Sequence, residues 1–168
     1  MAVDLDSVVG LIQKIYLLHE ERVDIYKLFE EGHNIYLDSA PNYNFSKFRQ
    51  LVNNITQEFK RISNSIIAIE KQLRFKGVFK IADIVTKLQD LEKTKLELSA
   101  KLQIAKQEVI DNTNSLDKRD LIVDIKQKIR EIVELINQQI LELRHEMVDF
   151  EEVNEEAFKK LIANKQYI

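Results

Sequence analysis

The spacing of apolar residues between positions 45 and 73 limits the possible folds more than any other feature of the chain. Apolar side chains recur there at alternating intervals of three and four, at Phe45, Phe48, Val52, Ile55, Phe59, Ile62, Ile66, Ile69 and Leu73. This spacing is typical of a coiled-coil seam. We therefore expect a helix over about residues 44 to 74 that packs along its whole length.

Three further helices are predicted from the same kind of pattern. Pro41 and its neighbouring asparagines separate the second helix from a first one over about residues 4 to 38, and Gly77 separates it from a third over about 78 to 110. The third seam consists of Ile81, Ile84, Leu88, Leu91, Lys95, Leu98, Leu102, Ala105 and Val109. Lys95 is its one charged member, and we expect its stem to pack while its ammonium group reaches solvent.

The first predicted helix differs from the others because it is apolar over most of its circumference. Such a helix has to be covered on more than one side. It lies centrally in a bundle, or it meets a partner protein on the face that its own chain leaves bare. A narrow polar strip is its exception, at Gln13, Glu20, Asp24, Lys27, Glu31, Asn34 and Asp38.

The fourth helix is predicted from about Leu116 to the C-terminal region. At 1.5 Å per residue it exceeds roughly 70 Å, against about 45 to 50 Å for the others, so its end overhangs. The predicted fold class is all-α, with four long antiparallel helices in a bundle, divided into a three-helix region (1–110) and a long C-terminal helix (111–168). The expected seam is Ile122, Ile125, Ile129, Ile132, Ile136, Ile140, Leu143, Met147, Phe150, Ala157 and Leu161, with a stutter at the paired steps of four.

Composition narrows the classes of function. The absence of cysteine excludes thiol nucleophiles, disulfides and thiolate metal sites. A formal charge of −3 argues against a broad surface for non-specific DNA binding. The start does not resemble a secretory signal, and the longest apolar stretch, around Val8 to Leu18, is interrupted by polar residues. We expect a soluble intracellular protein.

Two Glu-x-x-His pairs, Glu30 with His33 and Glu142 with His145, have the spacing found in di-iron bundles. Glu142 and His145 fall on outward positions, and the second and third helices offer no seam glutamate. We therefore interpret both pairs as solvated helix faces. The remaining histidine, His19, belongs to no nucleophile motif, and the dispersed glycines form no phosphate loop. No enzyme activity, metal or cofactor is expected.

The segment between the second and third helices mixes cations with aromatic residues: Arg74, Phe75, Lys76, Phe79 and Lys80. Such a mixture can grip phosphates and stack on unpaired bases. The alternative interpretation is that Phe75 and Phe79 close the end of the bundle while the cations stay hydrated. An acidic stretch at 149–156 could recruit a basic partner, or simply be a solvated helix.

Several short segments of the first three predicted helices and their connections carry a family resemblance: Glu20-Glu21-Arg22, Ile25-Tyr26, Leu28-Phe29-Glu30-Glu31, Tyr36-Leu37, Ala40-Pro41-Asn42-Tyr43-Asn44-Phe45, Phe48-Arg49-Gln50-Leu51-Val52, Leu88-Gln89-Asp90-Leu91-Glu92, Lys95-Leu96-Glu97-Leu98 and Leu102-Gln103. They resemble the "required for excision" B family of small helical proteins linked to DNA repair. The resemblance covers about residues 11 to 107 and implies a non-enzymatic factor in excision repair.

The resemblance also implies candidate partner-binding residues: Glu21, Arg22, Phe29, Pro41, Tyr43, Phe45 and Arg49. Alternatively, these residues only build the hairpin of the first two helices. The leading hypothesis is a nuclear or cytoplasmic adaptor that binds proteins of a larger complex through homo- or hetero-oligomeric coiled-coil contacts. A structural coiled-coil component of a cytoskeletal or ciliary complex is the alternative, and direct nucleic-acid binding at the 74–80 segment is a third hypothesis.

Overall fold

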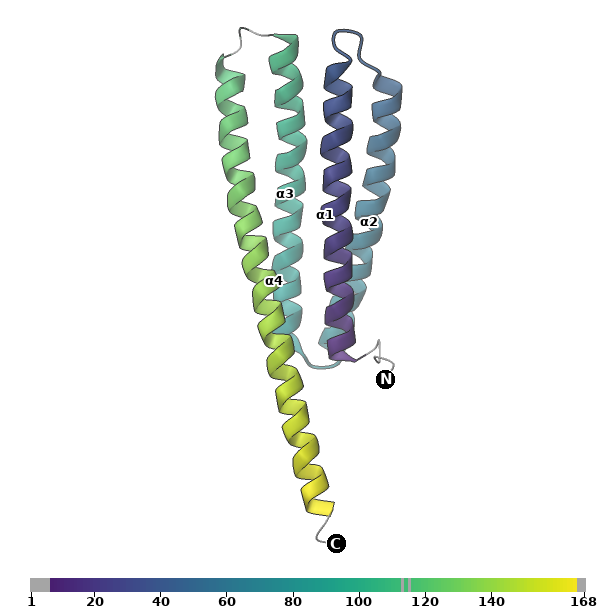
Figure 1. Cartoon of the computed structure of the whole chain (residues 1–168), viewed down its shortest axis with the longest axis vertical. Coiled ribbons are helices and arrows are strands. Elements are labelled where there is room, and N and C mark those ends of the chain that lie inside the picture. Colours follow the sequence, from purple (N-terminus) through teal and green to yellow (C-terminus); the bar gives the residue numbers. More distant parts are fainter. Residues whose placement is uncertain (1–6, 113, 115, 166–168) are drawn as a thin grey trace.

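The residues described by the computed structural model form four helices. Figure 1 shows that they lie side by side and antiparallel. The structure describes residues 7–112, 114 and 116–165. They form α1 (Val8–Asp38), α2 (Phe45–Phe75), α3 (Phe79–Asp111) and α4 (Leu116–Lys165). Successive helices run in opposite directions, so α1 pairs with α2 and α3 with α4 as two hairpins (Figure 1). The predicted all-α class is therefore confirmed.

Side-chain hydrogen bonds cap the first residues of α1 and α2. Ser7 caps α1 by accepting a hydrogen bond from the Gly10 amide at 3.0 Å, and Asn44 caps α2 by accepting one from the Lys47 amide at 3.4 Å. Between them the Ala40–Pro41 peptide bond is cis. The predicted start of the first helix, residues 4–6, lies outside the described residues.

The tightest packing is at the end of the bundle that holds the α2–α3 connection. The large side chains that are almost completely buried come from the first half of α1, the second half of α2, the first part of α3 and one position of α4: Leu11, Ile12, Ile15, Ile62, Ile66, Leu73, Val85, Leu88 and Leu143. The predicted α2 seam is buried from Ile55 to Leu73. Its first member, Phe45, is 59% exposed because the seam opens toward the α1–α2 connection.

Helix α1 has a buried face along its whole length, from Val8 to Tyr36, and an outer face that its own chain leaves exposed. Leu11, Ile12 and Ile15 are fully buried, and the Tyr16 hydroxyl donates a hydrogen bond to the Ile140 carbonyl oxygen of α4 at 3.1 Å. Farther along, apolar side chains on the outer face are more than half exposed: Leu17, Leu28 and Ile35.

Helix α4 extends past the ends of the other three helices (Figure 1). Ile125, Ile136 and Leu143 are buried members of its predicted seam, whereas Ile132 and Ile140, at the stutter, are half-buried. The side chains of Ala157 and Leu161 lie outside the described residues. Within the described part of the chain, no helix has a stretch apolar enough to span a membrane.

Candidate functional site

A buried polar cluster joins three helices at mid-height. Arg22 of α1 is 3% exposed, and its Nη2 donates to Ser63 Oγ of α2 at 3.3 Å and to Gln89 Oε1 of α3 at 3.0 Å. Its Nη1 lies 4.0 Å from Oε1 of Glu92, which is 6% exposed. His19 Nδ1 lies 3.8 Å from the same oxygen. The cluster sets the positions of α1, α2 and α3 relative to one another.

Burial dominates the electrostatics of this cluster. It raises the pKa of Glu92, against the opposing charges of Arg22 and Lys95, and it lowers the pKa of Arg22 and of His19. Arg22 Nη1, Glu92 Oε2 and His19 Nδ1 have no hydrogen-bond partner among the described protein atoms. In this cluster the free-energy cost of desolvating the charged groups therefore outweighs the electrostatic attraction between them.

Glu92 is the residue of this cluster that the sequence analysis missed. The predicted α3 seam passes through Leu91, but Leu91 is half-buried and Glu92 is the buried neighbour. The adjoining Lys95 also differs from expectation. Its Nζ lies 3.9 Å from the centroid of the Tyr26 ring, and burial lowers its pKa, so the ammonium group packs on an aromatic face instead of reaching freely into solvent.

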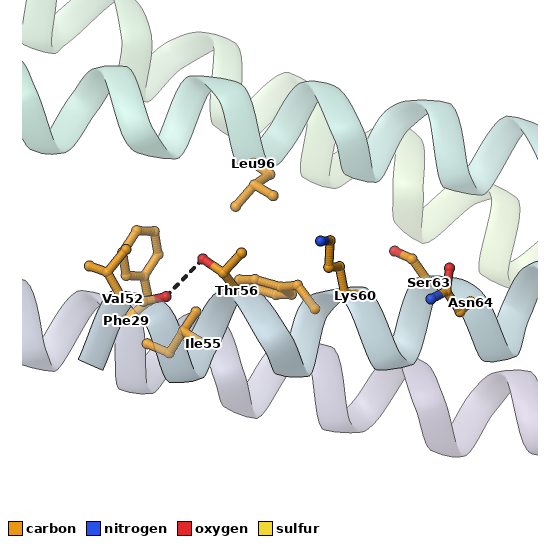
Figure 2. A pocket seen from close by; sticks show the side chains of 9 residues that line it. Phe29, Val52, Ile55, Thr56, Lys60, Ser63, Asn64 and Leu96 are labelled. Atoms are coloured by element: carbon orange, nitrogen blue, oxygen red, sulfur yellow. Dashed lines mark hydrogen bonds between the residues drawn. The ribbon is translucent and has the colours of Figure 1, made fainter. Parts of the chain in front are cut away.

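Above this cluster the two hairpins leave an apolar cleft between α2 and α3, of about 230 Å³. Figure 2 shows Leu96 of α3 across from Val52, Thr56 and Lys60 of α2, with the Thr56 hydroxyl donating to the Val52 carbonyl oxygen at 2.7 Å. The α1 side chain Phe29 forms part of its wall. Its polar lining residues all come from α2: Thr56, Lys60, Ser63 and Asn64.

A second cleft, between α1, α3 and α4, has about 420 Å³ and a different character. We call it the cationic cleft because its lining includes Lys27, Lys95, Lys106, Lys126 and Arg130, with Glu30 as its single carboxylate. Phe29 belongs to its wall as well. Burial and the charge of Lys106 lower the pKa of His33, which also lines this cleft, to about 4.

A third hollow, of about 400 Å³, lies on the outer face of the α1–α2 hairpin. We call it the hairpin groove; Leu28, Gly32 and Ile35 of α1 and Phe48 and Leu51 of α2 line it. The helices approach closely here, since a Cβ atom added at Gly32 would stand 1.9 Å from Leu51 Cδ2. Leu28 and Ile35 are 55% and 65% exposed, so apolar surface borders the groove.

Aromatic rings close the tip of this hairpin. Tyr36 stacks on Phe48 with ring centroids 4.4 Å apart, and Tyr43 lies 4.8 Å from Tyr36. The Tyr43 hydroxyl donates to Asp111 Oδ1 at 2.5 Å, which raises the pKa of Tyr43 to about 12. This hydrogen bond ties the tip of one hairpin to the end of α3.

The predicted partner-binding residues divide into two groups. Arg22 and Phe29 are buried, and Tyr43 bonds to Asp111, so these three hold the fold together. Glu21 pairs with Arg61 at 2.7 Å on the surface. The exposed members of the set are Glu21, Pro41, Phe45 and Arg49.

At the α2–α3 connection, the expectation that Phe75 and Phe79 close the bundle is wrong: they are 94% and 59% exposed. Gly77, at φ 76°, turns the chain between the two rings, and both point away from the core. Arg74 pairs with Glu70 and Asp83, and Lys80 with Glu146 at 2.5 Å. Of the predicted nucleic-acid contacts, Lys76 has no ion pair with a described carboxylate.

The two Glu-x-x-His pairs do not converge. Glu142 and His145 are exposed, as expected, and so is Glu30. The solvated interpretation is wrong for His33, which is 3% exposed and lies 5.5 Å from the Phe48 ring. Among the described residues, no three histidines or carboxylates come together as metal ligands would.

The fold and its surfaces define a class of small helical proteins with clefts between two hairpins, and the comparisons identify the family. The family model for DNA repair REX1-B matches residues 10–106. A "Required for excision 1-B domain-containing protein" from Bos taurus is 34% identical over 80% of this chain and 73% of its own length. One from Mus musculus is 31% identical over 80% and 78%. No solved structure matches. The chain belongs to the DNA repair REX1-B family, which confirms the resemblance seen in the sequence.

Proposed function

We propose that this protein is a non-enzymatic adaptor in DNA excision repair, working in the nucleus by binding other proteins. The observation that supports this most directly is the hairpin groove. It lies within the segment matched by the family model and combines an apolar floor with the exposed Leu28 and Ile35. Exposed apolar side chains around a hollow mark surfaces where proteins bind one another.

The test compares cells that lack the protein with cells in which it is restored. We expect slower removal of excisable lesions from genomic DNA without the protein, and full recovery with the wild-type chain. The Ile35→Glu variant should not restore the rate, because a carboxylate in the groove is costly to desolvate. The matched control is Ile104→Glu on α3, where the original side chain is 60% exposed and lies outside the groove.

Unchanged lesion removal in cells lacking the protein would exclude the repair role. A normal rate of lesion removal with the Ile35→Glu variant would show that the binding surface is not the hairpin groove. The structural alternative, in which the long α4 is a spacer in a cytoskeletal or ciliary complex, makes a different prediction. In that case the protein concentrates at filaments or cilia and the excision rate does not depend on it.

A further inference from the structure

The cationic cleft has an excess of positive charge that the rest of the molecule does not share. Five basic side chains line it against one carboxylate, Glu30, although the whole chain has a formal charge of −3. Some basic groups outside it pair with carboxylates, as Arg61, Arg74 and Lys118 do. Within the described chain, Lys27, Lys106, Lys126 and Arg130 form no such pair.

Like charges gathered in one cleft repel one another unless an anion occupies it. The effect is visible at His33, where the charge of Lys106 adds to burial in lowering the pKa. At Lys95 burial is the main cause of the lowered pKa, and Glu92 opposes it. An anionic occupant would offset the repulsion between the basic groups.

The floor of this cleft is apolar, which restricts the class of anion. Val23, Phe29, Leu102 and Ile129 line it between the basic groups. A volume of about 420 Å³ suits a few side chains but not a DNA duplex. Single strands bind by stacking on free aromatic faces, but Phe29 is only 9% exposed and Tyr26 already faces Lys95 and Phe59.

We infer that the cationic cleft binds an acidic segment of a partner protein in which apolar side chains alternate with carboxylates. Along α1 the cleft runs from Val23 to His33, about 15 Å at 1.5 Å per residue. An extended segment of about four or five residues covers that length. Its carboxylates meet the lysines of α1, α3 and α4, while its apolar side chains contact the floor. This inference rests on the proposed function, because it names the chemistry of a partner for the adaptor.

Binding can be measured on the full chain by fluorescence anisotropy with a fluorescein-labelled peptide of alternating sequence, Glu-Leu-Glu-Phe-Glu. We expect the double variant Lys106→Glu with Lys126→Glu to weaken binding by about tenfold or more. The matched control, Lys71→Glu with Lys76→Glu, makes the same change of net charge at the opposite end of the bundle and should leave binding within about twofold. Circular dichroism and thermal unfolding check that both variants fold.

Four results would overturn the inference. One is equal loss of binding in both double variants, which indicates only general electrostatic attraction. Another is tighter binding of a single-stranded DNA probe than of the peptide with the same dependence on Lys106 and Lys126. The third is self-association of the chain, if the two substitutions abolish it. The occupant of the cleft would then be the acidic 149–156 segment of a second copy. Failure of the peptide to bind also overturns the inference. The proposed function still stands in that case if the Ile35→Glu variant fails to restore lesion removal.

Discussion

Arg22 of α1 and Glu92 of α3 face each other inside the bundle, 3% and 6% exposed, with Nη1 and Oε1 4.0 Å apart. Removing one partner leaves an uncompensated buried charge, so Arg22→Met should lower the free energy of unfolding by about 3 kcal/mol. The double variant Arg22→Met with Glu92→Leu should recover most of that loss, since both desolvation penalties disappear together. Urea denaturation measures both. A double variant no more stable than the single one would show that the pair stabilises the fold by itself.

Acid should destabilise the protein partly through His33. Its pKa is about 4 in the folded chain against an ordinary 6.5, so the folded state disfavours the charged form. This contribution to stability is complete above pH 6.5 and is lost as the pH falls toward 4, by about 3 kcal/mol. The His33→Phe variant lacks it, whereas Glu92 and His19 titrate in both proteins. The difference between the two stability–pH curves isolates His33, and parallel curves would contradict the assignment.

Gly77 turns the chain between α2 and α3 with φ 76° and no other atoms within 4 Å of an added Cβ. Strain in Gly77→Ala is therefore purely a matter of backbone conformation, and we expect a loss of about 1 kcal/mol in unfolding free energy. Gly77→Asn should cost less, because asparagine tolerates the left-handed region. A larger loss for Gly77→Asn than for Gly77→Ala in thermal or urea unfolding would mean instead that the turn responds to side-chain size.

The hydrogen bond from Tyr43 to Asp111 should control how often the tips of the two hairpins separate. Tyr43→Phe removes the donor and leaves the ring beside Tyr36. Amide hydrogen exchange around residues 36–48 and 105–111 should become faster, with no change around the buried Leu11 and Leu73. Faster exchange throughout the bundle would instead mean that this hydrogen bond supports the whole fold.

The helices could be predicted from the sequence almost to the residue, and the clefts could not. A heptad pattern defines the buried face of each helix and its length, so predicted bounds of 44–74 and 78–110 become 45–75 and 79–111. It says nothing about the distance between hairpins. Glu92 is buried because Arg22, seventy positions earlier, lies opposite it, and the basic residues of the cationic cleft come from three helices. Those relationships depend on tertiary packing.

Phe29 belongs to the wall of both the apolar cleft and the cationic cleft. Any molecule that pushes this ring aside on one side changes the shape available on the other. Two ligands bound on opposite sides of the molecule would then sense each other through a single phenyl group, and the influence would be equal in both directions. The Phe29 ring would thus couple binding in the apolar cleft to binding in the cationic cleft.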